Sequence, residues 1–332
     1  MPDKKILKGI RPFNQFMFRS CYYHQLMSAY THFNVDETIV LKSFLPLYGF
    51  DEKAGMLSLY EQTLLTDDQL QAFTGVRLIK RRKSVNPIDE IIKAVDRGMP
   101  VIVAVDSFEL KYRTEVYKKT HVVHYILVYG YCKSDKTFII SENAYENSPV
   151  FKESIMPMAD LKYVMESFNQ HLMRKDGCIM IKLKRVSAEK PADDMGYGAL
   201  LAPYRNDLLQ SYAALLKFCE YFRNVAADGV DAISEKRTAL YETVLAVRTR
   251  KTAQRYQLSI LFNSNTVRYI SERIEQAFTF LCGVLYKLQI TGKCTQASIE
   301  KLCERVRDLQ NNEEWLHDFL VSGGVLSEGA TD

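Results

Sequence analysis

The sequence predicts an α+β domain over residues 1–186, followed by an antiparallel helical bundle over residues 199–323. Two patterns support this division. Up to residue 186, helical periodicity alternates with short runs of β-branched and aromatic residues. Beyond residue 198, apolar residues recur three and four positions apart, as in IEQAFTFLCGVLYKLQI. The stretch SAEKPADDMGYG at 187–198 combines Pro, Gly and charge and predicts a linker, and residues 324–332 predict a flexible tail.

The elements of the first domain follow from local signals. Helices are expected at 21–33, 36–46 and 88–97, and Gly98 and Pro100 end the last of them. Apolar β-branched runs predict strands at 101–105 and 124–131. The strand TFIIS at 137–141 follows the turn-like KSDK and should form a hairpin with its predecessor, and a last strand is expected at 178–186. The expected helices of the bundle are 199–224, 231–262, 264–290 and 295–321.

Composition excludes several classes of function. The 332 residues carry a net charge of only +4, which does not indicate a nucleic-acid-binding protein. No apolar run reaches the roughly 18 residues of a membrane span, and the start MPDKKILKGIRPF lacks the apolar region of a secretory signal, so we expect a cytoplasmic protein without membrane contact. No glycine-rich nucleotide motif is present, which argues against ATP-driven ligation.

The seven cysteines are odd in number, widely scattered and without a CxxC pair, which argues against a disulfide framework and a structural zinc site. We therefore expect neither a metal nor a bound cofactor. Cys21 differs from the others because it stands at the start of a predicted helix, after Ser20 as N-cap. Unpaired N–H groups at a helix N-terminus favour a thiolate. Cys21 is therefore the candidate nucleophile.

A thiolate nucleophile needs a base, and His124 is the preferred candidate. It begins the apolar run HYILVYGY and shares a strand face with Ile126 and Val128. His121 lies three residues earlier, so on the same strand it would point to the opposite face. We expect it nearer a loop, in contact with substrate at most.

The third catalytic role is to orient the imidazole, and two neighbouring residues compete for it. The strand TFIIS continues into Glu142 and Asn143, either of which can accept a proton from the far ring nitrogen. Gln15, six residues before Cys21, can supply an amide N–H to a developing oxyanion, together with the Cys21 backbone N–H.

These residues together resemble the papain-like cysteine peptidase fold and, within it, the family of the N-terminal domain of butirosin-biosynthesis protein H. The stretches that carry the resemblance are RSCYYHQLMSAY, GMPVIVAVDSFELKYRTEVYKKTHVVHYILVYGY and TFIISENA, within residues 10–185. "HYILVYGYCKSDKTFIISENA" also resembles the bacteriocin leader peptidases, where the second strand ends in Asp-Pro. This chain has Glu142-Asn143 there, so position favours Glu142 and analogy to papain favours Asn143.

The resemblance implies a papain-like fold and transfer of an acyl group from a carrier-protein thioester to an amine. Carried over by motif, Cys21 is the nucleophile, His124 the base, Glu142 or Asn143 the orienting residue and Gln15 the oxyanion donor. The implied partner is an acyl or peptidyl carrier protein, whose phosphopantetheine arm brings the donor, in a nonribosomal-peptide type of antibiotic biosynthesis. The basic run LIKRRK at 78–83 could meet its acidic helices.

Two other classes of function remain open at this point. A cysteine peptidase or amidase would use the same residues on a peptide or amide, and a non-catalytic scaffold would use the bundle to bind a partner. Asp106, at the end of the VIVAV strand, could line the substrate cleft or bond a turn, and Tyr112 could shape an acceptor pocket. The apolar faces of the bundle would suit a homodimer.

Overall fold

The computed structural model describes residues 2–15, 20–143, 150–173, 177–186, 196–293 and 295–324. The chain forms two compact units, one made of Met1–Val40 with Thr66–Asp193 and the other of Leu41–Leu65 with Asp194–Asp332. Most of the predicted linker, residues 187–195, lies outside the described residues, as does the predicted tail from residue 325 onward. Residues 41–65, which the sequence pattern assigned to the first domain, belong to the second unit.

The first unit is built on an antiparallel sheet, as predicted. The order of its strands is β4-β9-β5-β6-β7-β8, and β1 pairs with the far end of β6. The described strands are β1 (Lys4–Ile6), β4 (Val76–Arg81), β5 (Val101–Asp106), β6 (Val123–Cys132), β7 (Thr137–Asn143), β8 (Phe151–Pro157) and β9 (Met180–Arg185). The predicted hairpin is confirmed, because β6 and β7 pair from Leu127↔Ser141 to Cys132↔Thr137. The short β1 and the edge strands β4 and β8 were not predicted.

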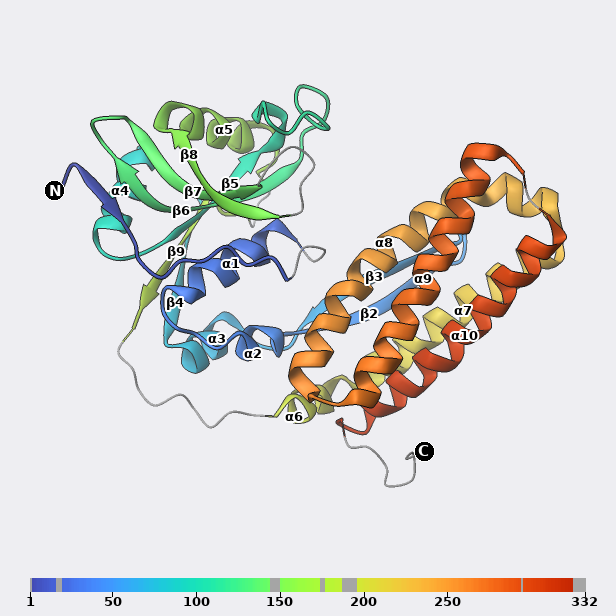
Figure 1. The fold of residues 1–332 in the computed structure, drawn as a ribbon. Coiled ribbons are helices and arrows are strands. Elements are labelled where there is room, and N and C mark those ends of the chain that lie inside the picture. Colours follow the sequence, from blue (N-terminus) through green and yellow to red (C-terminus); the bar gives the residue numbers. More distant parts are fainter. Residues whose placement is uncertain are drawn as a thin grey trace. The chain divides into compact units, whose positions relative to one another are not determined.

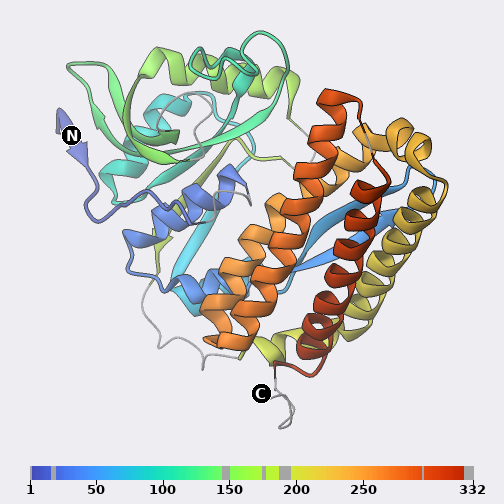
Figure 2. The same cartoon turned by 45° about the vertical axis from the view of Figure 1, so that its right-hand side comes forward.

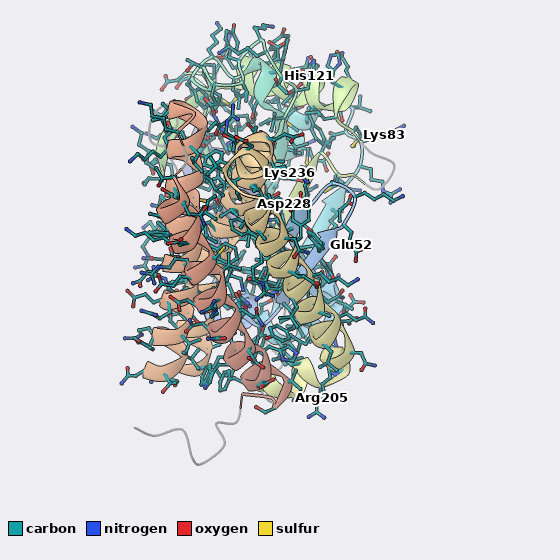
Figure 3. The ribbon with its side chains drawn as sticks, turned by 90° about the vertical axis from the view of Figure 1, so that its right-hand side faces the viewer. Glu52, Lys83, His121, Arg205, Asp228 and Lys236 are labelled. Atoms are coloured by element: carbon teal, nitrogen blue, oxygen red, sulfur yellow. The ribbon has the colours of Figure 1, made fainter. Side chains whose placement is uncertain are left out.

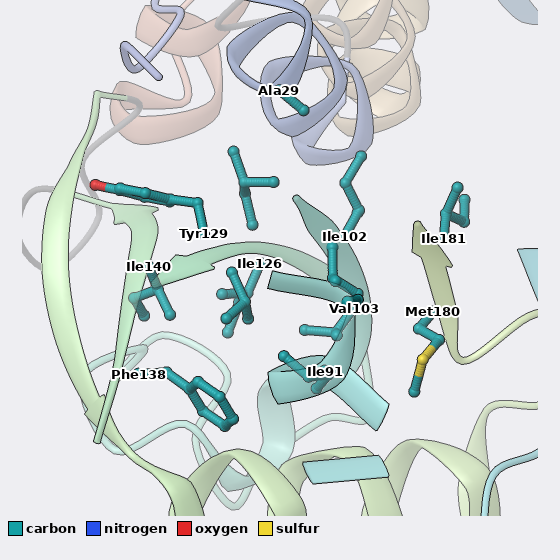
Figure 4. Packing of buried hydrophobic residues seen from close by; sticks show 14 of the residues in the cluster. Ala29, Ile91, Ile102, Val103, Ile126, Tyr129, Phe138, Ile140, Met180 and Ile181 are labelled. Carbon is teal, nitrogen blue, oxygen red and sulfur yellow. The ribbon is translucent and has the colours of Figure 1, made fainter. Parts of the chain in front are cut away.

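Helices pack on both faces of this sheet. The helices between residues 21 and 171 are α1 (Cys21–Thr31), α2 (Glu37–Leu41), α3 (Asp67–Thr74), α4 (Pro87–Asp96) and α5 (Met158–His171), and a 3₁₀ turn, η1 (Ser107–Glu109), follows β5. In Figure 1, α1 lies on one side of the sheet and α5 on the other. Apolar side chains of the central strands fill both interfaces: Figure 4 shows Ile102 directed toward Ala29 of α1, with Val103 and Ile126 on the other face. The core of this unit is therefore a sheet buried on both faces.

The second unit contains a β-hairpin as well as helices. The hairpin is β2 (Phe44–Asp51) and β3 (Met56–Thr63), and the helices are α6 (Tyr197–Leu201), α7 (Arg205–Ala227), α8 (Val230–Phe262), α9 (Asn265–Thr291) and α10 (Gln296–Val321), with a 3₁₀ turn, η2 (Ala202–Tyr204). In Figure 2 the hairpin lies along the long helices. The C-terminal helical region is thus confirmed. Figure 3 shows charged side chains covering its outer surface, among them Glu52, Asp228 and Lys236.

The predicted helix at 36–46 is wrong in its second half. The helix ends at Leu41, and β2 begins at Phe44. Pro46 within this segment cannot donate a helical hydrogen bond, and Phe44, Leu45 and Leu47 are all buried. In the hairpin these side chains pack against the helices of the second unit. The local sequence pattern does not predict this packing. Among the described helices, none is long and apolar enough to cross a membrane.

Candidate active site

Cys21 is the first residue of α1, the central buried helix of the first unit. Ser20 occupies the N-cap position in an extended conformation but makes no capping hydrogen bond with its side chain. The first turn contains no acidic residue. The positive end of the helix dipole is therefore left to the half-buried Cys21 thiol, where it favours the thiolate.

The buried Gln25 fixes α1 against the two strands that carry the other candidate residues. Its Nε2 donates to the Tyr125 carbonyl on β6 at 3.2 Å and to the Ser141 carbonyl on β7 at 3.0 Å. These carbonyls belong to the residues next to His124 and Glu142. One side chain thus sets the position of the helix relative to both strands. The sequence analysis missed Gln25, although a glutamine one helical turn after the cysteine, on a buried helix face, is a usable signal.

His124 and Glu142 form a buried pair across β6 and β7. Nε2 of His124 lies 2.9 Å from Oε1 and 3.1 Å from Oε2 of Glu142. Only about 5% of the His124 side chain and 4% of the Glu142 side chain are exposed. Because Nε2 faces the carboxylate, Nδ1 is the nitrogen left for Cys21, whose thiol is hydrogen-bonded to the His124 side chain.

The three groups together favour a thiolate–imidazolium pair. Burial alone would raise the pKa of Cys21, but the charge and hydrogen bond of His124 and a backbone hydrogen bond from Tyr125 lower it below its ordinary value. Burial alone would lower the pKa of His124, but Glu142 and Cys21 raise it to about 10. The pKa of the Glu142 carboxyl is lowered: burial opposes this, and the charge and hydrogen bond of His124 outweigh it. Near neutral pH, one proton is held on His124 between two anions.

Residues 55–143 match the family model described as "Butirosin biosynthesis protein H, N-terminal". The predicted resemblance is confirmed over this range, which contains His124 and Glu142 and ends at Asn143. Cys21 and Gln15 precede it, so their roles rest on the residues and on the geometry. A search of curated proteins finds no match to this chain.

Glu142 and Asn143, the two candidates for orienting the imidazole, make different contacts. Glu142 contacts the imidazole, whereas the Asn143 side-chain oxygen accepts from Arg113 Nη1 at 3.3 Å. The Asn143 backbone N–H donates to Glu142 Oε1 at 2.7 Å, and the Tyr112 hydroxyl donates to Oε2 at 2.9 Å. The geometry thus favours Glu142 as the orienting residue. Tyr112, predicted to contact substrate, holds this carboxylate.

Arg113 is a further neighbour that the sequence analysis missed. Its Nη1 lies 3.5 Å from His124 Nδ1, on the side of the ring that faces Cys21, and its Nε pairs with Glu115 at 2.5 Å. A guanidinium in this place can meet negative charge that develops at the reacting carbonyl or an anionic part of a substrate. The only sequence signal was a basic residue in the segment before β6, the strand that carries His124.

Gln15 lies at an exposed turn, and none of the hydrogen bonds within the described residues joins its side chain to Cys21. Residues 16–19, which connect the two, lie outside the described residues. The oxyanion role of Gln15 therefore stays a prediction. The Tyr125 backbone N–H, which lowers the Cys21 pKa through a hydrogen bond, is a second donor close to the sulfur.

His121 and Asp106 form a separate cluster. His121 precedes β6, and its Nδ1 lies 2.6 Å from Oδ2 of Asp106, which also accepts from Ser167 at 2.8 Å. Asp106 is fully buried, and its Oδ1 accepts from the Phe108 N–H. Both carboxylate oxygens are thus engaged by the protein. Of the two predicted roles for Asp106, the structure matches the turn and not the substrate cleft.

Four other cysteines have a pKa shifted in the opposite direction to that of Cys21. Burial raises the pKa of Cys178 and Cys303, and it raises that of Cys219 to about 12 and that of Cys282 to about 11. Cys294 lies outside the described residues. Within the part of the chain that the structure describes, no three His, Cys, Asp or Glu side chains gather where they could bind a metal ion.

Proposed function

We propose that this chain is a biosynthetic acyltransferase that forms an amide through an acyl-enzyme on Cys21, on a papain-like framework. The observation that carries the proposal is the buried His124–Glu142 pair next to a cysteine at a helix N-terminus, with the Cys21 pKa lowered. The match to the butirosin biosynthesis protein H family supports a role in antibiotic biosynthesis. The donor is a carrier-protein thioester on a phosphopantetheine arm, and the acceptor is an amine.

The first half-reaction forms the acyl-enzyme. The Cys21 thiolate attacks the thioester carbonyl, and the tetrahedral oxyanion that forms is met by the Tyr125 and Cys21 backbone N–H groups and, as predicted from the sequence, by Gln15. The C–S bond to the phosphopantetheine breaks, and the imidazolium of His124 gives its proton to the departing thiolate. His124 is then neutral, and its Nε2 still faces Glu142.

The second half-reaction transfers the acyl group. The acceptor amine attacks the acyl-enzyme carbonyl, and neutral His124 takes the proton that the amine loses. The bond to Cys21 breaks, which restores the thiolate and the imidazolium, so that charge and protons balance over the cycle. Water in place of the amine gives hydrolysis, the reaction of a peptidase or amidase. The fate of the acyl group depends on whether water reaches the acyl-enzyme.

Intact-protein mass spectrometry tests the proposal. Wild type and Cys21→Ala are each mixed with acyl N-acetylcysteamine thioesters, with and without a simple amine. We expect an acyl mass on wild type only, discharged by the amine to an amide. Cys219→Ala is the control, because burial keeps that thiol protonated. Discharge to free acid at the same rate with and without amine would make the chain a hydrolase, and absence of acylation would leave a binding scaffold.

The carrier protein has a candidate docking edge at β4, an outer strand of the sheet. Lys80 pairs with Asp67 and Arg81 with Glu90, while the exposed Lys83 follows the strand (Figure 3).

Charge reversal tests the docking edge. Lys83→Glu should raise the KM for a carrier-bound thioester several-fold at low salt, because rim charges contribute mainly to association. The KM for an N-acetylcysteamine thioester should not change. Lys4→Glu on β1 is the control, since this exposed lysine pairs with Cys132, at the end of β6 far from His124. Equal effects of the two variants would place docking elsewhere.

A further inference from the structure

The first unit contains a pocket of about 310 Å³ that the proposed chemistry does not use. It lies between the segment after β5, residues 109–118, and the N-terminal half of α5, with the end of β8 as a third side. Its volume is at the lower end of the range for small-molecule sites. Leu110, Met156 and Val164 give it a buried apolar base.

Three tyrosines line the pocket, namely Tyr112, Tyr117 and Tyr163. Phenol rings stack with aromatic ligands, and their π-faces attract cations. Tyr163 is about 53% exposed, so one side of the pocket is reached from solvent. The tyrosine rings and the apolar base of the pocket together favour binding of a small, flat molecule.

The pocket lining carries two acidic and two basic side chains. Glu109 pairs with Lys118 at 2.5 Å, and the Lys118 ammonium also lies 5.9 Å from the centre of the Tyr117 ring. Asp160, in the first turn of α5, and Lys111 also line the pocket, and within the described residues neither forms an ion pair. Both residues are exposed, but the long Lys111 side chain can turn its charge away from the pocket, whereas the short Asp160 carboxylate stays near the first turn of its helix. We infer that this pocket binds a small aromatic amine, with its ring against Tyr112 and Tyr163 and its ammonium toward Asp160.

The pocket shares one residue with the catalytic cluster. The Tyr112 side chain lines it, and the Tyr112 hydroxyl donates to Glu142 Oε2 at 2.9 Å. A bound ring that contacts Tyr112 therefore touches the residue that holds the orienting carboxylate. A ligand in the pocket would thus affect the His124–Glu142 pair through Tyr112.

Tyramine is the probe for this site, and binding to the full chain is followed by calorimetry and by ligand-detected NMR. A ligand of this size in such a pocket should bind with a Kd of about 0.1–1 mM. Its anionic counterpart, 4-hydroxyphenylacetate, should bind at least about fivefold more weakly because of Asp160 and the tyrosine faces. Equal or tighter binding of the acid would overturn the assigned ligand class.

A variant that fills the pocket tests whether tyramine binds there. Ala159 lines the pocket and is exposed on α5, so Ala159→Trp fills space without disturbing the core. It should weaken tyramine binding at least about tenfold. Asn169→Trp, at an exposed position of the same helix that does not line the pocket, should leave binding unchanged. Tyramine binding that survives Ala159→Trp, or no tyramine binding to wild type, would overturn the inference.

Cys21 alkylation by iodoacetamide tests the connection through Tyr112. Saturating tyramine should change the alkylation rate of wild type at least about twofold and leave that of Tyr112→Phe unchanged, because the phenylalanine cannot bond Glu142. A rate that tyramine leaves unchanged in wild type refutes the connection. Binding of tyramine to a chain whose Cys21 proves inert would refute the proposed function but not the pocket, and the opposite result would refute the pocket alone.

Discussion

Each of the two units buries an ion pair, and the two pairs have different surroundings. In the first unit, His124 and Glu142 lie 2.9 Å apart beside the half-buried Cys21. In the second, Lys251 Nζ lies 2.6 Å from Glu313 Oε1, and the Tyr48 hydroxyl donates to the same oxygen at 2.6 Å. The Lys251 ammonium also bonds Gln254 at 2.6 Å and lies over the Tyr48 ring.

The comparison indicates that a buried ion pair is not by itself a sign of a catalytic site. Lys251 and Glu313 border a cavity of only about 30 Å³, room for roughly one water molecule. Burial lowers the pKa of Lys251, and Glu313 opposes this shift. The lysine is buried and its ammonium bonds Glu313 and Gln254. The histidine, in contrast, bonds Glu142 through Nε2 and keeps Nδ1 for the half-buried Cys21 thiol.

Removal of the His124 imidazole should have the largest effect. His124→Asn keeps a polar side chain but can neither hold the proton of Cys21 nor give it to the leaving thiol. We expect acyl transfer to fall by a factor of about 10³ to 10⁴, as for a lost general acid–base. Stopped-flow thioester cleavage measures this loss. The double variant Lys251→Met, Glu313→Leu, which removes the other buried pair as a whole, should transfer acyl groups at the wild-type rate, and a comparable loss in both would mean that the two clusters do not differ as described.

The largest effect on stability should come from the other cluster. Lys251→Met leaves the Glu313 carboxylate buried without its cation, which costs about 3–5 kcal/mol in the free energy of unfolding. The double variant Lys251→Met, Glu313→Leu should recover most of this loss, because an apolar pair needs no partner. Urea unfolding of both variants checks the prediction. A single variant as stable as wild type would show that the pair does not organise the helical unit.

The lowered pKa of Cys21 and the raised pKa of His124 together set the pH range in which acyl transfer proceeds. The Cys21 pKa is lowered, so activity is lost only as the pH falls through this lowered value. The His124 pKa is about 10, so activity is lost again as the pH rises through about 10, where the imidazolium loses its proton.

In Glu142→Gln the charge that raises the His124 pKa is gone, and the alkaline limb should move to lower pH. At pH 8 we expect a rate about 10²-fold lower. The pH–rate profiles of wild type and of Glu166→Gln, an exposed control on α5, should coincide. An alkaline limb that stays near pH 10 in Glu142→Gln would remove Glu142 from the orienting role.

Gln25 should show the smallest effect of the set. Gln25→Met removes two hydrogen bonds to carbonyls of β6 and β7 and should cost about 1–3 kcal/mol. Because α1 then loses its register to both strands, Cys21 alkylation should slow by about tenfold. Ser28→Ala on the same buried helix serves as the comparison, since its hydroxyl bonds within α1 and to the Phe13 N–H but not to the sheet. Equal slowing in both variants would reduce Gln25 to a packing role.

The features predicted correctly from the sequence are those that a local residue pattern determines. Apolar runs located β5, β6 and β7, and the residue types at their ends located His124 and Glu142. The sequence could not predict what depends on distant contacts: the burial of Phe44 and Leu47 against the helices decides that the hairpin forms there. Gln25 and Arg113 were missed, and Tyr112 was predicted to shape an acceptor pocket instead of bonding Glu142, because the partners of these side chains lie 30 to 116 residues away or on another element.

The hairpin β2–β3 also has a consequence for how the protein can change over evolutionary time. The chain passes between the two units at residues 40/41, 65/66 and 193/194. A single recombination event can therefore not exchange the helical unit of one gene for that of another: it would leave two strands of the old unit with the helices of the new one. Substitutions in the helical unit must therefore keep its packing against a hairpin that is encoded within the other unit's stretch of sequence.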